Sequence, residues 1–226
     1  SVKSIGFAAF AGCDQLTTIA FPASLDSISG YAFSGSGLTS VELPASVKTV
    51  GEGAFARCEN LESATVGSEN IGKDAFYADA ALAALTLNKE VKTIGDGAFK
   101  SCSALTGINI EGSALESIGN EAFAYTSISA LDLSAQKSLK TVGGWALAKT
   151  PISTATLPNS VSSVGEGTFF YAAQLETTNL PDNLTTVPAF TFAGAEALVG
   201  ENIVPATATE MGDFSFYNAC AMPNFT

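Results

Sequence analysis

Residues 49–61 read TVGEGAFARCENL, and residues 93–105 repeat them almost letter for letter as TIGDGAFKSCSAL. Both stretches combine a β-branched residue, two glycines, a small residue followed by Phe, and a Cys three positions after the Phe. Self-similarity at a fixed spacing is the signature of a repeat protein, in which each unit packs against the next. These stretches therefore predict a repetitive architecture.

The same pattern recurs along the whole chain of 226 residues. Its ten matches are separated by 23, 22, 21, 23, 24, 24, 22, 23 and 24 residues. They begin at Ile5, Ile28, Val50, Ile71, Ile94, Ile118, Val142, Val164, Val187 and Met211. We interpret each step as one turn of a solenoid, with residues 1–226 as a single solenoid domain of a longer chain.

Each turn contains two extended phrases. The first, such as LTSVELP at 38–44, alternates polar and apolar residues, which predicts a half-buried strand. The same phrase stands at 16–22 and 175–181, and proline ends it because proline lacks the N–H that a ladder needs. The second, such as SVKTVG at 46–51, is expected to bury Val47 and Val50. The glycine that ends it indicates either a positive φ or a close backbone approach.

An aromatic position follows in every turn but one, where Leu147 stands instead. The residue before it is always Ala, Thr or Ser, as expected where neighbouring turns lie ~4.8 Å apart and a larger side chain would meet its own copy. We predict that the rings stack into one structural spine. Its members are Phe10, Phe33, Phe55, Phe76, Phe99, Phe123, Phe169, Phe192 and Phe216.

The phrase L-x-x-I-x-L-P-x-S-V-x-x-I-G-x-x-A-F-x-x-C, nearly complete at 38–58, resembles the BspA-like class of leucine-rich repeats. The resemblance covers essentially the whole chain. It implies a curved, right-handed solenoid of about ten turns of 21–24 residues, with short parallel strands on one face and little regular helix. It also implies surface or secreted proteins of host-associated bacteria and some protozoan parasites, linked to adhesion. The turns at 71–93 and 198–212 depart from the pattern, which leaves their strand register open.

Composition excludes several function classes. The chain is 46% hydrophobic, but polar residues interrupt every apolar run before the ~18 residues that a membrane helix needs. A net charge of −12 with ten basic residues argues against nucleic acid and anionic membranes as partners. The absence of histidine removes the usual general base and a common zinc ligand.

The cysteines and acidic residues favour structural roles. Cys13, Cys58 and Cys102 occupy equivalent positions in alternate turns, ~9–10 Å apart, too far for a disulfide. We expect free thiols, with only Cys220 exposed, and neither a metal nor a cofactor. Acidic residues follow the corner glycines, and because they repeat, a solvated edge is favoured over a catalytic pair or a calcium column. They are Glu52, Asp96, Glu166 and Asp213.

Function is therefore expected on the surface. The outward residues of the first phrase are small and mostly neutral, and they form a candidate binding platform for a protein or glycan. We call Glu42, Thr65, Thr86, Asn109, Asp132, Thr156 and Asn179 the strand-face file. Four aromatic residues, Tyr31, Trp145, Phe170 and Tyr171, form the second set of contact candidates.

These features predict a non-enzymatic adhesion module at the cell surface or secreted from the cell. Its partner would be a protein or glycan on a host or neighbouring cell, and end-to-end self-association is expected from the open sheet ends. The alternatives are a structural spacer in a multidomain surface protein and, less favoured, an enzyme acting on glycans.

Overall fold

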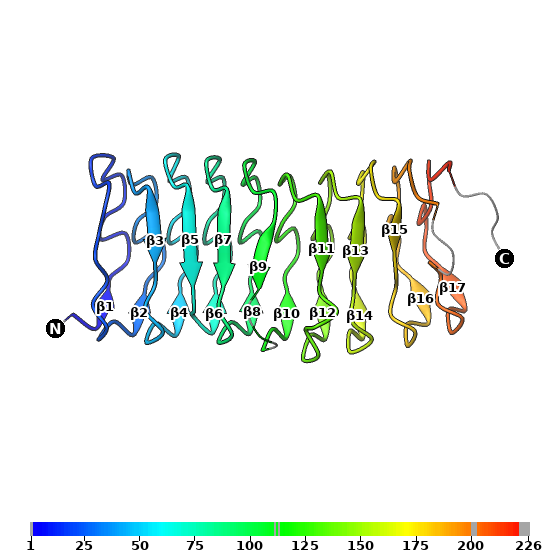
Figure 1. Cartoon of the computed structure of the whole chain (residues 1–226), viewed down its shortest axis with the longest axis horizontal. Coiled ribbons are helices and arrows are strands. Elements are labelled where there is room, and N and C mark those ends of the chain that lie inside the picture. Colours follow the sequence, from blue (N-terminus) through cyan, green and yellow to red (C-terminus); the bar gives the residue numbers. More distant parts are fainter. Residues whose placement is uncertain (1, 111, 113, 200–202, 222–226) are drawn as a thin grey trace.

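The computed structural model describes residues 2–110, 112, 114–199 and 203–221. In these residues the chain forms 17 short strands and no helix. Figure 1 shows the turns side by side along one axis, with the two termini at opposite ends. The predicted solenoid is confirmed: its ten matches bound nine complete turns, and every paired strand is parallel.

The second phrase of each turn forms the longest sheet, which has eight strands. Each strand is two residues long, and the register places the starting residue of each match over the next, as in Ile28 over Val50. The shortened turn keeps this register, because Val50 pairs with Ile71. The strands are β1 (Ser4–Ile5), β2 (Ser27–Ile28), β4 (Thr49–Val50), β6 (Asn70–Ile71), β8 (Thr93–Ile94), β10 (Ser117–Ile118), β12 (Thr141–Val142) and β14 (Ser163–Val164).

The first phrase forms a second row of strands, which Figure 1 shows beside the first. It consists of a four-stranded and a three-stranded sheet. These are β3 (Ser40–Glu42), β5 (Ser63–Val66), β7 (Ala84–Leu87) and β9 (Ile108–Ile110), followed by β11 (Ala130–Asp132), β13 (Thr154–Thr156) and β15 (Thr177–Thr178). The strand predicted at 16–22 does not form: the Thr39 N–H of the next turn donates to Thr17 O at 3.1 Å, but the phrase stays irregular.

A third set of hydrogen bonds joins the turns through segments that are not strands. In the segment 53–57, Gly53 N–H donates to Lys73 O at 2.9 Å, and Phe55 N–H and Arg57 N–H donate to Ala75 O and Tyr77 O at 2.8 Å each. Equivalent bonds recur from Ala8 to Gly194. We call this set the turn ladder.

The turn ladder depends on left-handed backbone. In every turn the third and the seventh residues after the start of the match have φ between 52° and 76°. Only six of these twenty positions are glycine, although a left-handed conformation costs other residues ~1–2 kcal/mol each. The third positions are Ala8, Tyr31, Gly53, Asp74, Gly97, Glu121, Trp145, Gly167, Phe190 and Phe214, and the seventh are Gly12, Gly35, Arg57, Ala78, Ser101, Tyr125, Lys149, Tyr171, Gly194 and Asn218.

Close backbone approach, and not positive φ, explains the glycine that ends the second phrase of most turns, which we call the corner glycine. Gly95 and its equivalents do not have positive φ. A Cβ at Gly95 would instead lie 2.7 Å from the Gly72 carbonyl carbon and 2.8 Å from both Ile71 O and Lys73 N. Close approach to the backbone of the previous turn therefore requires glycine at this position.

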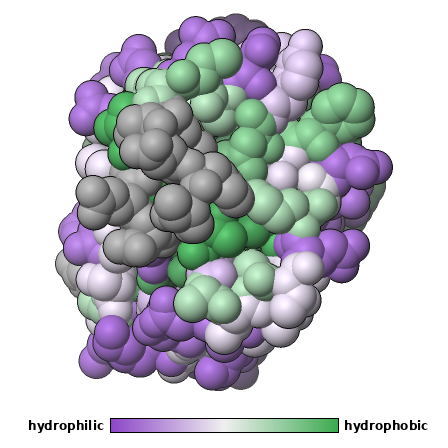
Figure 2. All heavy atoms as spheres, turned by 90° about the vertical axis from the view of Figure 1, so that its right-hand side faces the viewer, coloured by the Kyte–Doolittle hydropathy of each residue, from purple (hydrophilic) through white to green (hydrophobic). Residues whose placement is uncertain are grey.

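The predicted spine of phenylalanines is confirmed. Ring centroids from Phe10 to Phe123 are 5.1–5.5 Å apart with interplanar angles of 2–13°. Leu147 interrupts the stack, which resumes with Phe169, Phe192 and Phe216 at 5.6 and 5.0 Å. The rings join the inward Leu, Ile and Val residues in one core along the axis, and Figure 2 shows hydrophobic residues in the middle of the C-terminal end with hydrophilic residues around them.

Proline weakens one interface between turns. From β2 onward, the N–H of the residue after each strand of the eight-stranded sheet donates to the preceding turn, as Gly165 N–H does to Val142 O at 2.8 Å. Pro188 holds the equivalent place in the next turn and has no N–H, so the sheet ends at β14. The last two turns pair separately through β16 (Thr186–Val187) and β17 (Glu210–Met211). The turn ladder bridges this interface, with Gly167 N–H donating to Ala189 O at 2.9 Å.

The glycine contacts can be tested with a matched pair of substitutions. Gly95→Ala should lower the free energy of unfolding by ~2 kcal/mol or more, because its Cβ meets rigid backbone. Gly6→Ala should change it by less than ~0.5 kcal/mol, since Gly6 holds the same place in the first turn and a Cβ there would have nothing within 4 Å. Urea denaturation measures both values, and equal losses would contradict the close-approach explanation.

Candidate binding surfaces

The strand-face file is in register within each sheet. Glu42 pairs with Thr65, Thr65 with Thr86, and Thr86 with Asn109, while Asp132 pairs with Thr156. Side chains of the file are exposed or half-buried, and the residues before and after them point into the core. β9 and β11 are not paired, so the file consists of two segments rather than one continuous row.

Two members of the file have local structural partners. Asp132 Oδ1 accepts the Ser134 N–H at 2.8 Å, and this bond lowers the pKa of the Asp132 carboxyl. The Asn179 side-chain amide donates to Leu157 O at 2.8 Å and accepts the Leu157 N–H at 3.0 Å. It replaces the backbone pairing that β15, only two residues long, does not provide. Asn179 therefore has a structural role at this position, and its role in binding stays a prediction.

The cysteine position forms a buried file with one charged member. Cys58 and Cys102 are free thiols whose Sγ atoms donate to carbonyls of earlier turns, Phe33 O at 3.2 Å and Phe76 O at 3.1 Å. Burial raises the pKa of Cys58 to about 11 and raises that of Cys102 as well, so both are protonated and unreactive. Cys13 is exposed, contrary to expectation, because no earlier turn covers it; Cys220 is exposed as predicted.

Asp79 lies in this file between the two buried thiols. It is fully buried, and only its Oδ1 has a partner in the described structure, the Cys58 N–H at 2.8 Å; its Oδ2 has none. Burial raises the pKa of Asp79 well above the ordinary value for a carboxyl. Burial with one unpaired oxygen gives this acid the features of a buried neutral group. Among the described residues, no group of three or more His, Cys, Asp or Glu side chains could hold a metal ion.

The acidic residues after the corner glycines differ from turn to turn. Glu52 accepts a hydrogen bond from the Tyr31 hydroxyl at 3.2 Å, and Asp96 Oδ1 accepts the Asn120 N–H at 2.6 Å. Glu166 and Asp213 are exposed, and no Lys or Arg of the described residues lies within ion-pair distance of them. Of these four acidic residues, Glu52 and Asp96 thus accept hydrogen bonds from their own chain, whereas Glu166 and Asp213 are open to solvent.

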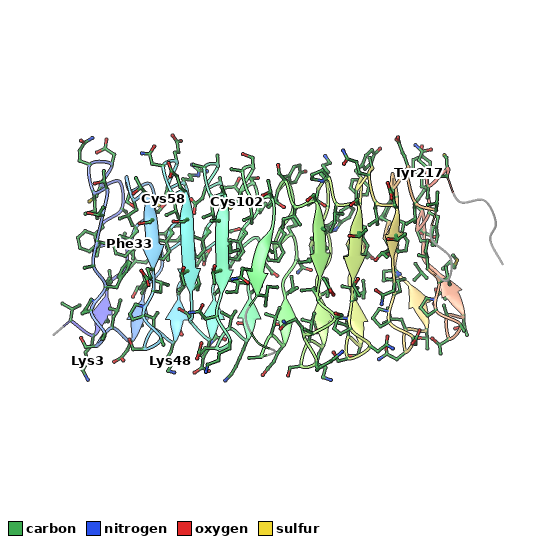
Figure 3. The ribbon with its side chains drawn as sticks, viewed as in Figure 1. Lys3, Phe33, Lys48, Cys58, Cys102 and Tyr217 are labelled. Carbon is green, nitrogen blue, oxygen red and sulfur yellow. The ribbon has the colours of Figure 1, made fainter. Side chains whose placement is uncertain are left out.

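A file of alternating charge, which the sequence analysis missed, runs along another edge. It consists of Lys3, Asp26, Lys48, Glu69, Lys92, Glu116 and Lys140, at equivalent positions in successive turns. Glu69 contacts Lys48 at 3.3 Å and Lys92 at 2.7 Å, and the bond to Lys92, followed by that to Lys48, lowers the pKa of Glu69. Figure 3 shows Lys3 and Lys48 pointing outward along this edge. A slip by one turn would place like charges together, so the file favours the observed register.

Six exposed or half-buried aromatic residues gather at the C-terminal end of the turn ladder. Trp145 and Phe170 have centroids 4.7 Å apart, and Phe170 lies 4.5 Å from Tyr171. The series continues through Phe190, Phe214 and Tyr217, with Phe190 and Phe214 stacked at 5.3 Å and Phe214 and Tyr217 at 5.9 Å. We call these six residues the aromatic ridge. Tyr31, the remaining candidate from the sequence, lies apart against Phe7 at 5.8 Å.

Glycines in neighbouring turns make room for these rings. A Cβ at Gly167 would lie 2.6 Å from the Trp145 ring, and one at Gly194 would lie 3.0 Å from the Tyr171 ring. Tyr31 covers Gly53 in the same way. At these three places a ring lies flat over the glycine of the next turn, whereas Phe190 and Phe214 in successive turns stack on each other instead.

A shallow polar hollow lies at the corner of the first three turns. Asp14, Ser36, Arg57, Glu59 and Asn60 line it. Its acidic and basic side chains come from the segment after the Phe of each turn, and the hollow is open to solvent.

Comparisons with known proteins agree with this geometry. A family profile described as "BspA type Leucine rich repeat region (6 copies)" matches residues 1–106 and 92–222. The chain belongs to the BspA-type leucine-rich repeat family. No curated protein sequence matches it significantly. The structure contains no helix, among the residues it describes, that is long and apolar enough to span a membrane.

Three solved structures show the same fold. A leucine-rich repeat protein from Bacteroides ovatus is 24% identical, with a TM-score of 0.83 over 98% of this chain and 57% of that one. The Treponema pallidum leucine-rich repeat protein TpLRR is 22% identical, with a TM-score of 0.65 over 93% and 89%. A third, from Eubacterium ventriosum, is 17% identical, with a TM-score of 0.51 over 99% and 82%. This BspA-type chain thus spans little more than half of the Bacteroides ovatus structure.

The buried acid makes a testable contribution to stability. Because the folded-state pKa of Asp79 is raised, its stabilising contribution is complete below pH ~4 and is lost as pH rises, with a slope of up to ~1.4 kcal/mol per pH unit until the folded pKa is reached. Asp79→Asn should remove this slope. The difference in unfolding free energy between variant and wild type, measured by urea denaturation, should therefore move in favour of the variant between pH 4 and 7.

The exposed Glu59→Gln is the control, and its difference from wild type should stay within ~0.5 kcal/mol over the same range. Parallel pH profiles for wild type and Asp79→Asn would show that Asp79 is charged in the folded protein.

Proposed function

We propose that this chain is a non-enzymatic binding module, displayed at or secreted from the cell surface, that recognises a protein or glycan on a host or neighbouring cell. The observation that carries the proposal is the in-register strand-face file from Glu42 to Asn109. Its side chains are short, at least partly exposed and able to form hydrogen bonds, and they stand on a sheet whose other face is anchored in the core.

The spacing of the file supports recognition of an extended ligand. Equivalent groups recur every ~4.8 Å along the axis, so a chain lying across several turns would meet the same chemistry at each step. Individual contacts of this kind are weak, and the face lacks the Trp, Tyr and Arg that dominate compact tight interfaces. Many copies on one cell would supply avidity.

Binding assays with immobilised protein test the proposal. Saturable binding is expected to at least one of a set of matrix proteins, mucins and bacterial cells. Thr65→Arg together with Thr86→Arg, which places long charged side chains on the file, should weaken this binding at least tenfold. Ser162→Arg should leave it unchanged and serves as the matched control, because Ser162 is exposed one turn beyond Lys140, the last member of the alternating-charge file.

The two alternatives give different results in these assays. A spacer would bind no member of the set. A glycan-acting enzyme would release reducing sugars from mucin during incubation, and either result would contradict the proposal. Self-association through the hydrophobic C-terminal end in Figure 2 would appear as a concentration-dependent mass in sedimentation.

A further inference from the structure

In the middle turns, cationic side chains contact the aromatic rings at the turn ladder. The Arg57 guanidinium lies 6.0 Å from the Tyr77 ring centroid. Lys149 and Lys100 lie 5.1 and 6.0 Å from the Tyr125 ring centroid. These distances are those of cation–π contacts. In each case the cation comes from a neighbouring turn.

The last turns have the rings with fewer cations. All ten basic residues of the sequence lie at or before Lys149. Residues 150–226 contain seven of the 22 acidic residues and no basic one, and so carry −7 of the net charge of −12. Tyr171 occupies the same left-handed position as Tyr125, two turns further on. Lys149 stands at this position in the turn between them, and its ammonium lies over the Tyr125 ring. Among the described residues, no cation–π contact to the Tyr171 ring is present.

The ridge is also accessible. Phe214 and Tyr217 expose 59% and 55% of their surface and Tyr171 exposes 46%, while Trp145, Phe170 and Phe190 are half-buried and support them. Figure 3 shows Tyr217 at the outer edge of the last turn, away from the strands. The six rings extend over four turns, ~15 Å along the axis, which matches four to five residues of an extended peptide.

Exposed carboxylates flank the ridge. Glu166 precedes Gly167, which lies beneath the Trp145 ring, and Asp213 precedes Phe214. Glu196 stands two residues after Gly194, which lies beneath the Tyr171 ring. None of these three carboxylates forms an ion pair with the described part of the chain.

We propose that the aromatic ridge binds a Lys- or Arg-rich segment of a partner protein. The cations of this segment stack on Tyr171, Phe214 and Tyr217 and pair with Glu166, Glu196 and Asp213, which reproduces between two proteins the contacts that Lys100 and Lys149 make with Tyr125 within this one. The inference rests on the proposed role as a binding module and names the chemistry of one partner. Charge decides against a neutral glycan, which would use the rings but not the acidic surface.

Fluorescence anisotropy with labelled ten-residue peptides tests the proposal. A peptide of alternating Lys and Ser should bind saturably and more weakly as NaCl is raised from 10 to 150 mM, because the screening length falls from ~30 Å to ~8 Å in this range. The Arg–Ser peptide should bind at least as tightly, and the Glu–Ser peptide should not bind. Comparable binding of the Glu–Ser peptide would overturn the proposal.

Matched variants separate the ridge from general acidity. Tyr171→Asn together with Tyr217→Asn should weaken binding of the Lys–Ser peptide about tenfold, the effect of losing two exposed cation–π contacts. Asn suits the left-handed backbone at Tyr171. Tyr125→Asn should change it less than about twofold, since this ring has the same φ class and exposure, 44%, but is already covered by two lysines.

The carboxylates are tested with the rings intact. Glu166→Gln with Asp213→Asn should reduce the salt dependence of binding, whereas Glu52→Gln, the same position in the third turn, should leave it unchanged. Equal losses from the Tyr125 and Tyr171 variants would show unspecific attraction to an acidic protein. Saturable binding of chitohexaose without binding of the Lys–Ser peptide would favour a glycan, and a dimer lost in the Tyr171 and Tyr217 variant would favour a second copy; each would overturn the proposal.

This test is independent of the strand face. Thr65→Arg with Thr86→Arg should not change binding of the Lys–Ser peptide. Peptide binding at the ridge with no ligand for the strand face would therefore contradict the proposed function alone, and the reverse result would contradict the ridge alone.

Discussion

The backbone hydrogen bonds between successive turns determine the rest of this structure. Three ladders, two of them in strands and one in left-handed turns, hold each turn ~4.8 Å from the next. At this distance the chain has no room for variation at the points of closest approach. The spacing therefore favours glycine at the corners and small residues before the phenylalanines.

The same spacing makes every side chain a neighbour of its own equivalents. Inward positions become continuous files, of which the phenylalanine stack is the clearest. At outward positions, each side chain must fit beside its equivalents in the turns before and after it. In one file the charge alternates from Lys3 to Lys140, and elsewhere a bulky residue lies over a glycine, as Trp145 does over Gly167. Asp79, buried beside two thiols with one oxygen unpaired, is a member that fits its file poorly.

The two surfaces proposed to bind partners follow from these files and differ in chemistry. The strand face repeats small polar groups over four turns and suits a broad contact of low affinity. The aromatic ridge concentrates six rings and a local excess of negative charge at one end, which suits a compact contact with a cationic chain. A module with both could engage two parts of one partner, because the surfaces lie on different segments of each turn.

Sequence alone determined the architecture, since a repeat spelled ten times reports the packing of its core directly: the phenylalanine spine, the buried valines and the free thiols Cys58 and Cys102 all lie where the repeat predicts. Only the tertiary structure decided which residues at the ends of the solenoid lack a covering turn and which side chains bond to a neighbouring turn. Cys13 and the 16–22 phrase follow the pattern but lack an earlier turn, and Asn179 has a strand-face position but a side chain bonded to Leu157. The left-handed positions carry almost any residue, so no sequence signal marks the turn ladder. The aromatic ridge forms from residues 145 to 217 only because the ladder stacks those turns, and proximity between turns is a property of the fold.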